Sequence, residues 1–247
     1  MGAPVRTINP HISVDCVIFG FTTNQLKVLL IEREYLDELG DPATDHKLPG
    51  DFIAINEDPD LAATRTLEEL TGLKNIYLQS FAMFGHPDRI SRQVDFQWLR
   101  ATTGMNIHRV VTAAYYALIN ITEARNELVT AHHASWTDMK WIPALAFDHE
   151  EIIQAGLHHL QRTLRNEPIG FELLPERFTI RELQSLYEVI LGHTLDNRNF
   201  RKKVLKARYL VQLDEKQEGV PHKPAHYYRF DRDLYEKINR DQNSFNF

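Results

Sequence analysis

The sequence predicts an α+β fold, in which an α/β/α sandwich precedes a smaller domain of two helices and a β-hairpin. Strand-like segments surround one well-capped helix in the first part, and a long amphipathic helix at 147–166 follows them. Charge also shifts: residues 170–247 hold 14 Lys and Arg against 12 Asp and Glu, whereas residues 1–169 hold 14 against 22. We therefore expect two domains, 1–167 and 168–247.

The first domain contains five strand-like segments and two helices. β-branched and aromatic residues predict strands at 14–20, 26–33, 76–84, 108–121 and 135–142. A helix is expected after Asp58, a natural N-cap, with Pro59 in its first turn and Gly72 as its C-cap. The helix at 147–166 carries its apolar side chains on one side, which closes a sandwich.

The second domain combines two helices with two short alternating segments. Thr179 and Glu182 are spaced as a capping box ahead of an amphipathic helix, and a basic helix at 197–210 follows a tight link. The alternating segments are 209–213 and 226–230, on either side of a polar loop. Helix, tight link, basic helix and hairpin predict a winged helix-turn-helix.

The basic helix carries the residue types that read nucleic acid. Asn and Arg near the start of such a helix can bind adenine and guanine bidentately, while further Lys and Arg neutralise phosphates. The predicted DNA-binding residues of the helix are Asn197, Arg198, Asn199, Arg201, Lys202 and Lys203, and those of the hairpin are Lys216 and Lys223. The alternative is a solvated basic helix face without a nucleic-acid partner.

The stretch 48–73, LPGDFIAINEDPDLAATRTLEELTGL, has the spacing of an enzyme loop and helix. Nudix hydrolases use a Gly, five residues, a Glu, seven residues, then Arg-Glu-apolar-x-Glu-Glu-x-Gly-apolar. Anchoring on Gly72 places Arg65, Glu69 and Glu57 at their expected positions. The stretch therefore resembles a Nudix motif and predicts a Nudix-like sandwich.

Two of the metal-binding carboxylates of that motif are absent. Thr66 and Leu70 stand where Glu is expected, and Asp51 stands where Gly is expected. Positions 66, 69 and 70 share one helical face, on which three carboxylates would hold Mg²⁺. Glu69 alone is a poor metal site, so we expect no metal, no cofactor and no catalytic residue.

Longer segments resemble a known family, the Nudix-related transcriptional regulators of bacteria. The resemblance is strongest in VDCVIFGF at 14–21, AYYALIN at 114–120 and EPIGFELLPERFTIRELQSLYEVILGHTLDNRNFRKKVL at 167–205. The family includes NrtR-type repressors of NAD metabolism and arabinose-responsive regulators. It implies a Nudix-like effector domain joined to a winged helix, working as a homodimer on a double-stranded, partly palindromic operator. A small ligand, ADP-ribose or NAD-related or a pentose sugar, would change the affinity for DNA.

Polar residues near the motif are candidates for the effector site. Arginines suit phosphate or carboxylate groups, and carboxylates suit sugar hydroxyls. The predicted effector-binding residues are Arg33, Glu57, Arg65, Glu69, Asp88, Arg89 and Arg109. As an alternative, Glu57 and Arg65 can pair with each other and only hold the loop.

Residues 91–106, SRQVDFQWLRATTGMN, look inserted relative to the family. We expect a long irregular loop there, in which Phe96 and Trp98 pack over the pocket or against a partner subunit.

Composition indicates a cytoplasmic location. The single cysteine, Cys16, cannot form an internal disulfide, the N-terminus lacks the apolar core of a signal peptide, and no apolar run is long enough to span a bilayer. The sequence thus predicts a ligand-responsive, DNA-binding transcriptional regulator, a repressor by resemblance, with a catalytically degenerate Nudix domain. The alternatives are a hydrolase with residual metal-dependent activity on a nucleoside diphosphate derivative, and a metabolite-binding protein whose winged helix contacts proteins.

Overall fold

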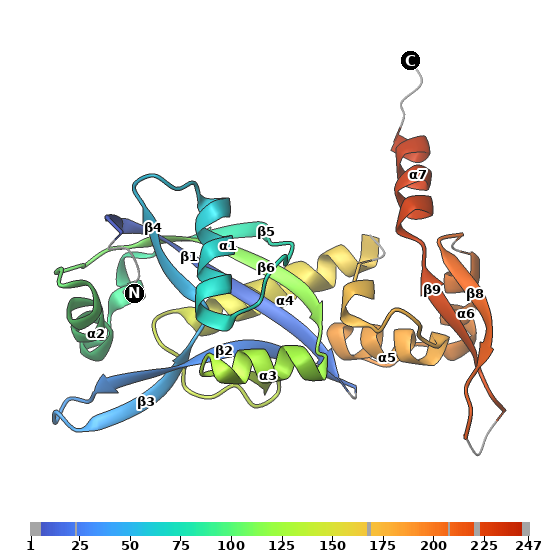
Figure 1. Cartoon of the computed structure of the whole chain (residues 1–247), viewed down its shortest axis with the longest axis horizontal. Helices are drawn as coiled ribbons and strands as arrows, with labels where there is room; N and C mark the ends of the chain where they lie inside the picture. Colours follow the sequence, from blue (N-terminus) through green and yellow to red (C-terminus); the bar gives the residue numbers. More distant parts are fainter. Residues whose placement is uncertain (1–5, 23, 167–168, 207, 220–222, 244–247) are drawn as a thin grey trace. The chain divides into compact units, whose positions relative to one another are not determined.

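The computed structural model describes residues 6–22, 24–166, 169–206, 208–219 and 223–243 (Figure 1). The chain divides into two compact units, Met1–Arg162 and Thr163–Phe247. The boundary predicted between residues 167 and 168 lies outside the described residues, five positions beyond this division. No helix in the described ranges is both long and apolar enough to cross a membrane.

A seven-stranded mixed sheet forms the centre of the first unit. Its strands are β1 (Ile8–Thr22), β2 (Gln25–Leu36), β3 (Pro42–Lys47), β4 (Gly50–Ala54), β5 (Gln79–Phe84), β6 (Val111–Asn120) and β7 (Ala134–Asp138). The order is β3-β2-β1-β6-β5, with β4 also paired to β1 and β7 to β2. Only the β1–β6 pair is parallel among these, with Cys16 opposite Tyr115.

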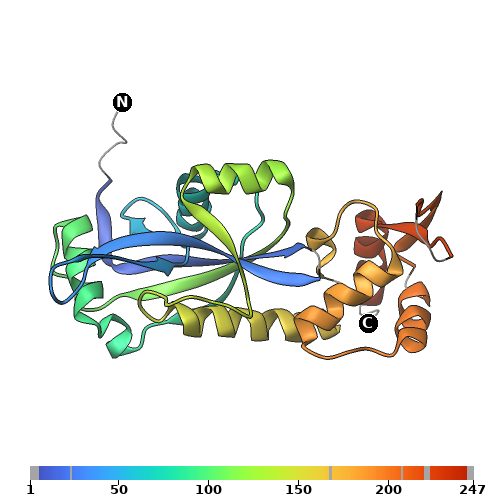
Figure 2. The same cartoon turned by 90° about the horizontal axis from the view of Figure 1, so that it is seen from below.

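Helices cover both faces of this sheet (Figures 1 and 2). Side chains of β1 alternate between the faces, as the period of a strand requires. Cys16 and its like-facing neighbours join a buried cluster with α1 (Pro59–Thr71) and α3 (Glu123–Ala131). Val17 faces the other way and approaches Gly156 of α4 (His149–Asn166). The predicted α+β sandwich is confirmed.

The caps of α1 form as the sequence predicts. The Asp58 carboxylate accepts a hydrogen bond from the Leu61 amide at 2.8 Å, and Pro59 occupies the first helical position. Gly72 ends the helix in the left-handed region, with φ 73°. These caps fix where α1 begins, and so where Arg65 and Glu69 project.

Some predictions for the first unit are corrected. The segment 91–106 is not an irregular loop: it contains the helix α2 (Gln93–Thr103), and the 3₁₀ helix η1 (Pro87–Ile90) directly precedes it. Asp95 and Leu99 of α2 are buried, a four-residue spacing typical of a helix with one inward face. The strand expected at 135–142 ends at Asp138, and Trp141 is exposed. The sequence analysis also missed β3, β4 and α3.

The second unit is a winged helix. It contains η2 (Phe171–Leu173), α5 (Ile180–Leu191), α6 (Asn197–Lys206), the hairpin β8 (Leu210–Lys216) and β9 (His226–Phe230), and α7 (Arg232–Asn243), which was not predicted. The capping box is present, since Thr179 and Glu182 bond reciprocally at the start of α5. A stacked pair, Phe171 on Phe230, ties η2 to the hairpin. The predicted winged helix is confirmed.

The tight link between α5 and α6 is set by a few side-chain bonds. The Glu188 carboxylate accepts from the Leu195 amide at 3.0 Å and from Gln184 at 2.8 Å. Gln184 also donates to the Leu195 carbonyl at 3.0 Å. Asp196 then caps α6 by accepting from the Asn199 amide at 2.7 Å.

Candidate functional site

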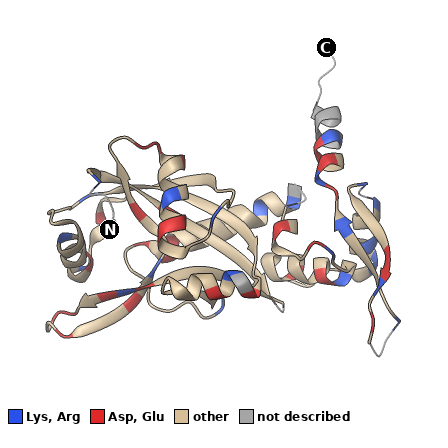
Figure 3. Cartoon of the chain, viewed as in Figure 1, with Lys and Arg blue, Asp and Glu red and all other residues tan. Residues whose placement is uncertain are grey.

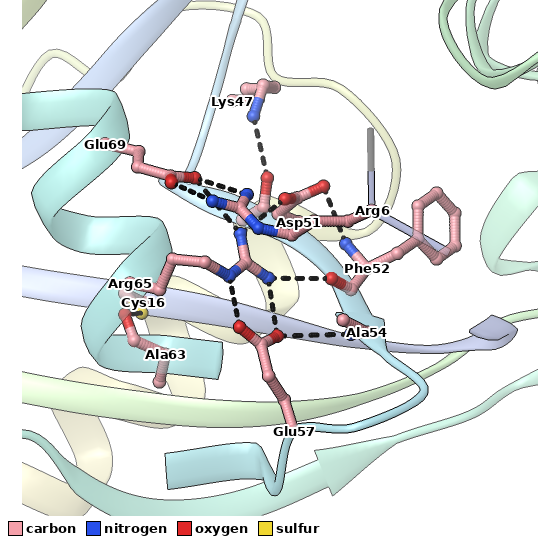
Figure 4. Close-up of polar contacts among 11 residues, drawn as sticks. Arg6, Cys16, Lys47, Asp51, Phe52, Ala54, Glu57, Ala63, Arg65 and Glu69 are labelled. Carbon is pink, nitrogen blue, oxygen red and sulfur yellow. Dashed lines mark hydrogen bonds and ion pairs between the residues drawn. The ribbon is translucent and has the colours of Figure 1, made fainter. Parts of the chain in front are cut away.

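Arg65 is the centre of a charged cluster between α1 and β4 (Figure 4). Its Nε and Nη2 donate to the Glu57 carboxylate at 2.7 and 3.0 Å. Its Nη1 donates to Asp51 at 2.8 Å and to Glu69 at 3.3 Å, and Nη2 also reaches the Phe52 carbonyl at 3.0 Å. All five N–H groups of this guanidinium therefore have acceptors.

This saturation decides between two interpretations of Glu57 and Arg65. Both Glu57 oxygens accept from Arg65, which holds the pKa of Glu57 below its usual range, and one of them also accepts from the Ala54 amide at 3.1 Å. An anion would have to displace one of these partners to reach Arg65. The alternative in which the two residues pair and hold the loop is the one the contacts support.

Arg6, which the sequence analysis did not single out, joins the same cluster from the segment before β1. Its Nη1 donates to a Glu69 oxygen at 2.8 Å, and its Nη2 donates to the other Glu69 oxygen. The Arg6 guanidinium holds the pKa of Glu69 below its usual range. Figure 4 shows the contacts of Glu69 with the guanidinium groups of Arg6 and Arg65.

The residues of this face do not fit the divalent cation that Nudix hydrolysis uses. Thr66 is fully buried, and its hydroxyl has no partner among the described residues. Leu70 offers no donor atom, and both Glu69 oxygens accept from guanidinium groups. A hard cation prefers several free carboxylate oxygens, and no metal-binding group of three or more His, Cys, Asp or Glu occurs in the described ranges.

A cavity of about 500 Å³ opens beside this cluster. One part of its lining is an apolar cluster from β4, α2 and the segments before β6 and α4, in which the Trp98 and Phe147 rings meet edge to face at 6.2 Å. The predicted packing of Trp98 over a pocket is therefore confirmed, whereas Phe96 stacks on His108. The other part of the lining is charged and includes Arg6 and Arg89.

Arg89 lines this cavity and has an unused donor, Nη1, which neighbouring atoms cover. The side chain is buried, with Nε and Nη2 donating to Asp148 at 3.2 and 2.8 Å and Nη2 also to Asp15 at 3.4 Å. Its Nη1 has no acceptor within the described part of the chain. A buried N–H without a partner is costly, so this atom is suited to an anionic or carbonyl oxygen of a ligand.

Lys47 and His149 complete the charged part of the lining. Burial lowers the pKa of His149 to about 3, so the imidazole is neutral at pH 7. Its Nδ1 accepts from the Leu48 amide at 2.9 Å, and its Nε2 lies 3.4 Å from Asp15. Lys47 donates to the Gly50 carbonyl at 3.1 Å, and burial lowers its pKa although Asp15 opposes this.

Three predicted effector residues lie elsewhere. Arg33 is 2% exposed, and it donates to Asp45 at 2.7 and 2.5 Å and to Asp95 at 2.8 Å. Asp88 is exposed beside His86, and Arg109 is exposed and reaches the Gly85 carbonyl at 3.4 Å. Of the seven predicted effector residues, Arg89 is the one found in the described lining of the cavity.

The lining also contains residues that sequence reasoning missed. Asp15 and Lys47 are buried charges inside strands, at positions where an alternating or apolar pattern expects hydrophobic side chains. That mismatch was a usable signal, because buried charges are rare unless they are paired or functional. Arg6 and His149 offered no such signal, since their partners Glu69 and Leu48 are distant in sequence.

In the second unit, α6 presents the predicted basic face (Figure 3). Phe200 points inward and packs edge to face on Tyr187 at 5.4 Å. The side chains of Asn197, Arg198, Arg201 and Lys202 are exposed, and no ion pair among the described residues engages the Arg and Lys of α6. This face is therefore open to a polyanion.

Two of the predicted DNA-binding residues of α6 line a groove. Asn199 and Lys203, four residues apart, border a groove of about 470 Å³ that Tyr187 and Tyr209 also line. On the hairpin, Lys216 ends β8 and Lys223 lies in the loop before β9, both exposed. The base of this wing is anchored by the Phe178–Tyr228 backbone bridge.

Known proteins match both units of the chain. Residues 9–156 match the NUDIX domain family, and residues 170–230 match the NrtR DNA-binding winged helix domain. The ADPR responsive transcriptional repressor NtrR of Acinetobacter baylyi is 31% identical over 226 residues, which are 90% of this chain and 82% of that protein.

Solved structures agree with these matches. NrtR of Shewanella oneidensis, crystallised with a 27mer DNA, has a TM-score of 0.70 and 27% identity, covering 91% of this chain and 95% of its own. A MutT/nudix family protein from Enterococcus faecalis shares the fold, with a TM-score of 0.62 at 24% identity and coverage of 93% and 89%.

A Nudix domain followed by a DNA-binding winged helix defines a Nudix-related transcriptional regulator. Since the Acinetobacter relative spans nearly the whole chain at 31% identity, the chain belongs to the NrtR family of these regulators. The resemblance predicted from the sequence is confirmed.

Proposed function

We propose that this protein is an ADP-ribose-responsive transcriptional repressor whose Nudix domain senses the ligand without hydrolysing it. The Acinetobacter relative is named as an ADPR-responsive repressor, and the Shewanella relative was crystallised with DNA. Family membership makes the same pairing of ligand and operator the first hypothesis for this chain.

One observation carries the proposal: the buried Arg89 guanidinium keeps its Nη1 unpaired, among the described residues, at a cavity with an aromatic wall. When a ligand uncovers Nη1, a diphosphate oxygen can accept from it, and charge-assisted bonds of this kind are among the strongest in proteins. Trp98 and Phe147 offer faces and edges to an adenine ring. ADP-ribose contains both groups.

The other candidate ligands and activities have less support. A pentose carries no charge to meet Arg89 or Lys47, although its hydroxyls suit Asp15 and Asp51. Residual hydrolysis needs a cation at Glu69, whose two oxygens already accept from guanidinium groups. ADP-ribose binding without turnover is therefore favoured.

On the DNA side, we propose that α6 enters the major groove. Asn197 and Arg198, near its start, would read base edges, while Arg201 and Lys202 would contact phosphates. Lys216 and Lys223 would contact phosphates from the wing. Two such units in a homodimer would bind two half-sites, and ADP-ribose would change their spacing and so the affinity for the operator.

A gel-shift titration tests the proposal. The full chain should bind a DNA fragment from the region upstream of its own gene with strongly salt-dependent affinity, and saturating ADP-ribose should shift that affinity at least about fivefold. ADP-ribose should also raise the melting temperature, whereas a pentose such as arabinose should not. Unchanged DNA affinity at saturating ADP-ribose, with binding demonstrated by the thermal shift, would contradict the regulatory role.

A further inference from the structure

We propose that Arg6 replaces the divalent cation of the Nudix site: held by Glu69, its guanidinium binds the diphosphate of the ligand. This inference rests on the proposed function, because it concerns the same cavity. It adds a ligand-binding residue from the segment before β1 and predicts that ligand binding needs no metal.

Arg6 contacts the motif helix and also lines the cavity. It lies in the lining of the cavity and is bound by both oxygens of Glu69. Glu69 occupies the place in the motif where a carboxylate holds the metal that bridges to substrate phosphate. A positive charge is thus fixed next to the cavity by a carboxylate of the motif helix.

Arg6 also has hydrogen-bond donors that no described residue uses. A guanidinium has five N–H groups, and Arg65 uses all of them on protein acceptors. Arg6 uses two, both on Glu69, within the described part of the chain. Its remaining donors are available to a second anion, and its side chain is still about a third exposed, at 32%.

Arg6 also changes the charge of the cavity lining. Apart from Arg6, the acidic and basic side chains that line the cavity are Lys47, Arg89, Asp15 and Asp51, two basic residues against two carboxyl groups, with His149 beside them. His149 is neutral at pH 7, because burial lowers its pKa to about 3. Arg6 therefore adds a third cation to this lining, and its partner Glu69 is not part of the lining.

The test is calorimetric titration of the full chain with ADP-ribose, once in EDTA and once in Mg²⁺. The wild-type protein should bind equally well in both buffers, within about twofold. Arg6→Ala should weaken binding about tenfold in both, the size expected for one charge-assisted contact to a partly exposed group, and Arg6→Lys should fall between the two. Lys140→Ala, which removes one exposed positive charge away from the cavity, is the matched control and should leave affinity unchanged.

Two further probes separate ligand contact from a structural role. Adenosine lacks the diphosphate, so its affinity should be the same in wild type and Arg6→Ala. Inorganic pyrophosphate lacks the nucleoside, and its metal-free binding should depend on Arg6. Glu69 affects ligand affinity only by positioning Arg6. In the Arg6→Ala background, Glu69→Gln should therefore cause little further loss of ADP-ribose affinity.

The outcomes distinguish this inference from the proposed function. Binding that requires Mg²⁺, or equal ADP-ribose affinity in Arg6→Ala and wild type, would overturn the role of Arg6 while leaving ADP-ribose as the effector. Pyrophosphate binding that depends on Arg6, without any ADP-ribose binding, would support Arg6 and refute the proposed effector. Failure to bind either probe would refute both. Melting temperatures of the free variants confirm that each is folded.

Discussion

The two units of the molecule use basic side chains in opposite ways. In the Nudix domain, Arg33, Arg65 and Arg89 are buried or nearly so and paired with carboxylates. In the winged helix, Arg198 and Arg201 are exposed on α6 without an ion pair among the described residues. The first group is bound to its own chain, and the second is available to another molecule.

This comparison shows that residue type alone does not indicate a ligand contact; the number of unused donors does. Arg65 has none left, whereas Arg89 keeps both N–H groups of Nη1 in an otherwise satisfied buried network. Arg89 therefore combines both properties, since its Nε and Nη2 donate to carboxylates and its Nη1 has no acceptor among the described residues.

Arg33→Ala should lower the free energy of unfolding by about 3 kcal/mol, because it leaves the buried Asp45 and Asp95 with the partly exposed Arg92 as their shared cation. Urea unfolding of the wild type and the variant measures this loss. A matched change at an exposed arginine of α6, Arg201→Ala, should alter stability by less than about 0.5 kcal/mol. Equal losses in the two variants would remove the contrast between the units.

Replacing Arg198 and Lys202 together by alanine should weaken DNA binding about a hundredfold at low salt, since two phosphate or base contacts are lost. The slope of log affinity against log salt should fall by about 2 if both contacts are to phosphate. Fluorescence anisotropy at several salt concentrations measures both quantities. Lys237→Ala, an exposed position in α7, is the control with unchanged affinity and slope.

The pH dependence of the free energy of unfolding tests whether burial keeps His149 neutral. Its folded-state pKa of about 3 lies below the ordinary value of 6.5, so between these values the unfolded chain binds a proton that the folded chain does not. The contribution of His149 to stability is complete above pH 6.5 and declines as the pH falls towards 3. Between pH 6.5 and 5 the wild type should lose up to about 2 kcal/mol more than His149→Asn, which cannot titrate.

Urea unfolding at a series of pH values provides that comparison. The side-chain oxygen of asparagine can still accept a hydrogen bond from the Leu48 amide, so the variant keeps this contact but has no titratable group at position 149. Parallel pH profiles for the two proteins would mean that His149 is not held neutral by burial.

The smallest effect is expected for Arg89→Lys. Lysine keeps a positive charge near Asp148 and Asp15 but cannot supply the Nη1 donor. ADP-ribose affinity should fall about tenfold, while the free energy of unfolding changes by about 1 kcal/mol or less. Calorimetry and urea unfolding together separate the two uses of this residue, and a loss of stability without a loss of affinity would assign Arg89 to the fold alone.

Much of the fold could be predicted because its signals are local. The caps of α1 and the Thr179–Glu182 capping box lie within a few residues of the helices that they start. Strand β4 and helix α3 were missed because five and nine residues give too little periodic pattern. The insertion was misjudged because comparison with the family suggested a loop, although Asp95 and Leu99 already had helical spacing.

The site was harder to predict for a physical reason. The motif located Glu57, Arg65 and Glu69 correctly, but their partners decide their role, and spacing does not reveal those partners. Arg33 looked like a polar candidate near the end of a strand, yet Asp95 meets it from 62 positions away. Long-range pairing of this kind depends on the tertiary arrangement, so local pattern could identify charged residues but not which of them had donors to spare.

Gly50 has a consequence for how this pocket can diverge among relatives. A Cβ atom there would lie 2.0 Å from an Asp15 oxygen and 2.9 Å from the Val14 carbonyl, so no other residue fits without moving β1. Position 50, beside the paired strands β1 and β4, is thereby resistant to substitution. New ligand preferences can arise more readily from the short helix α2, which contributes Trp98, Leu99, Thr102 and Thr103 to the lining from outside the sheet.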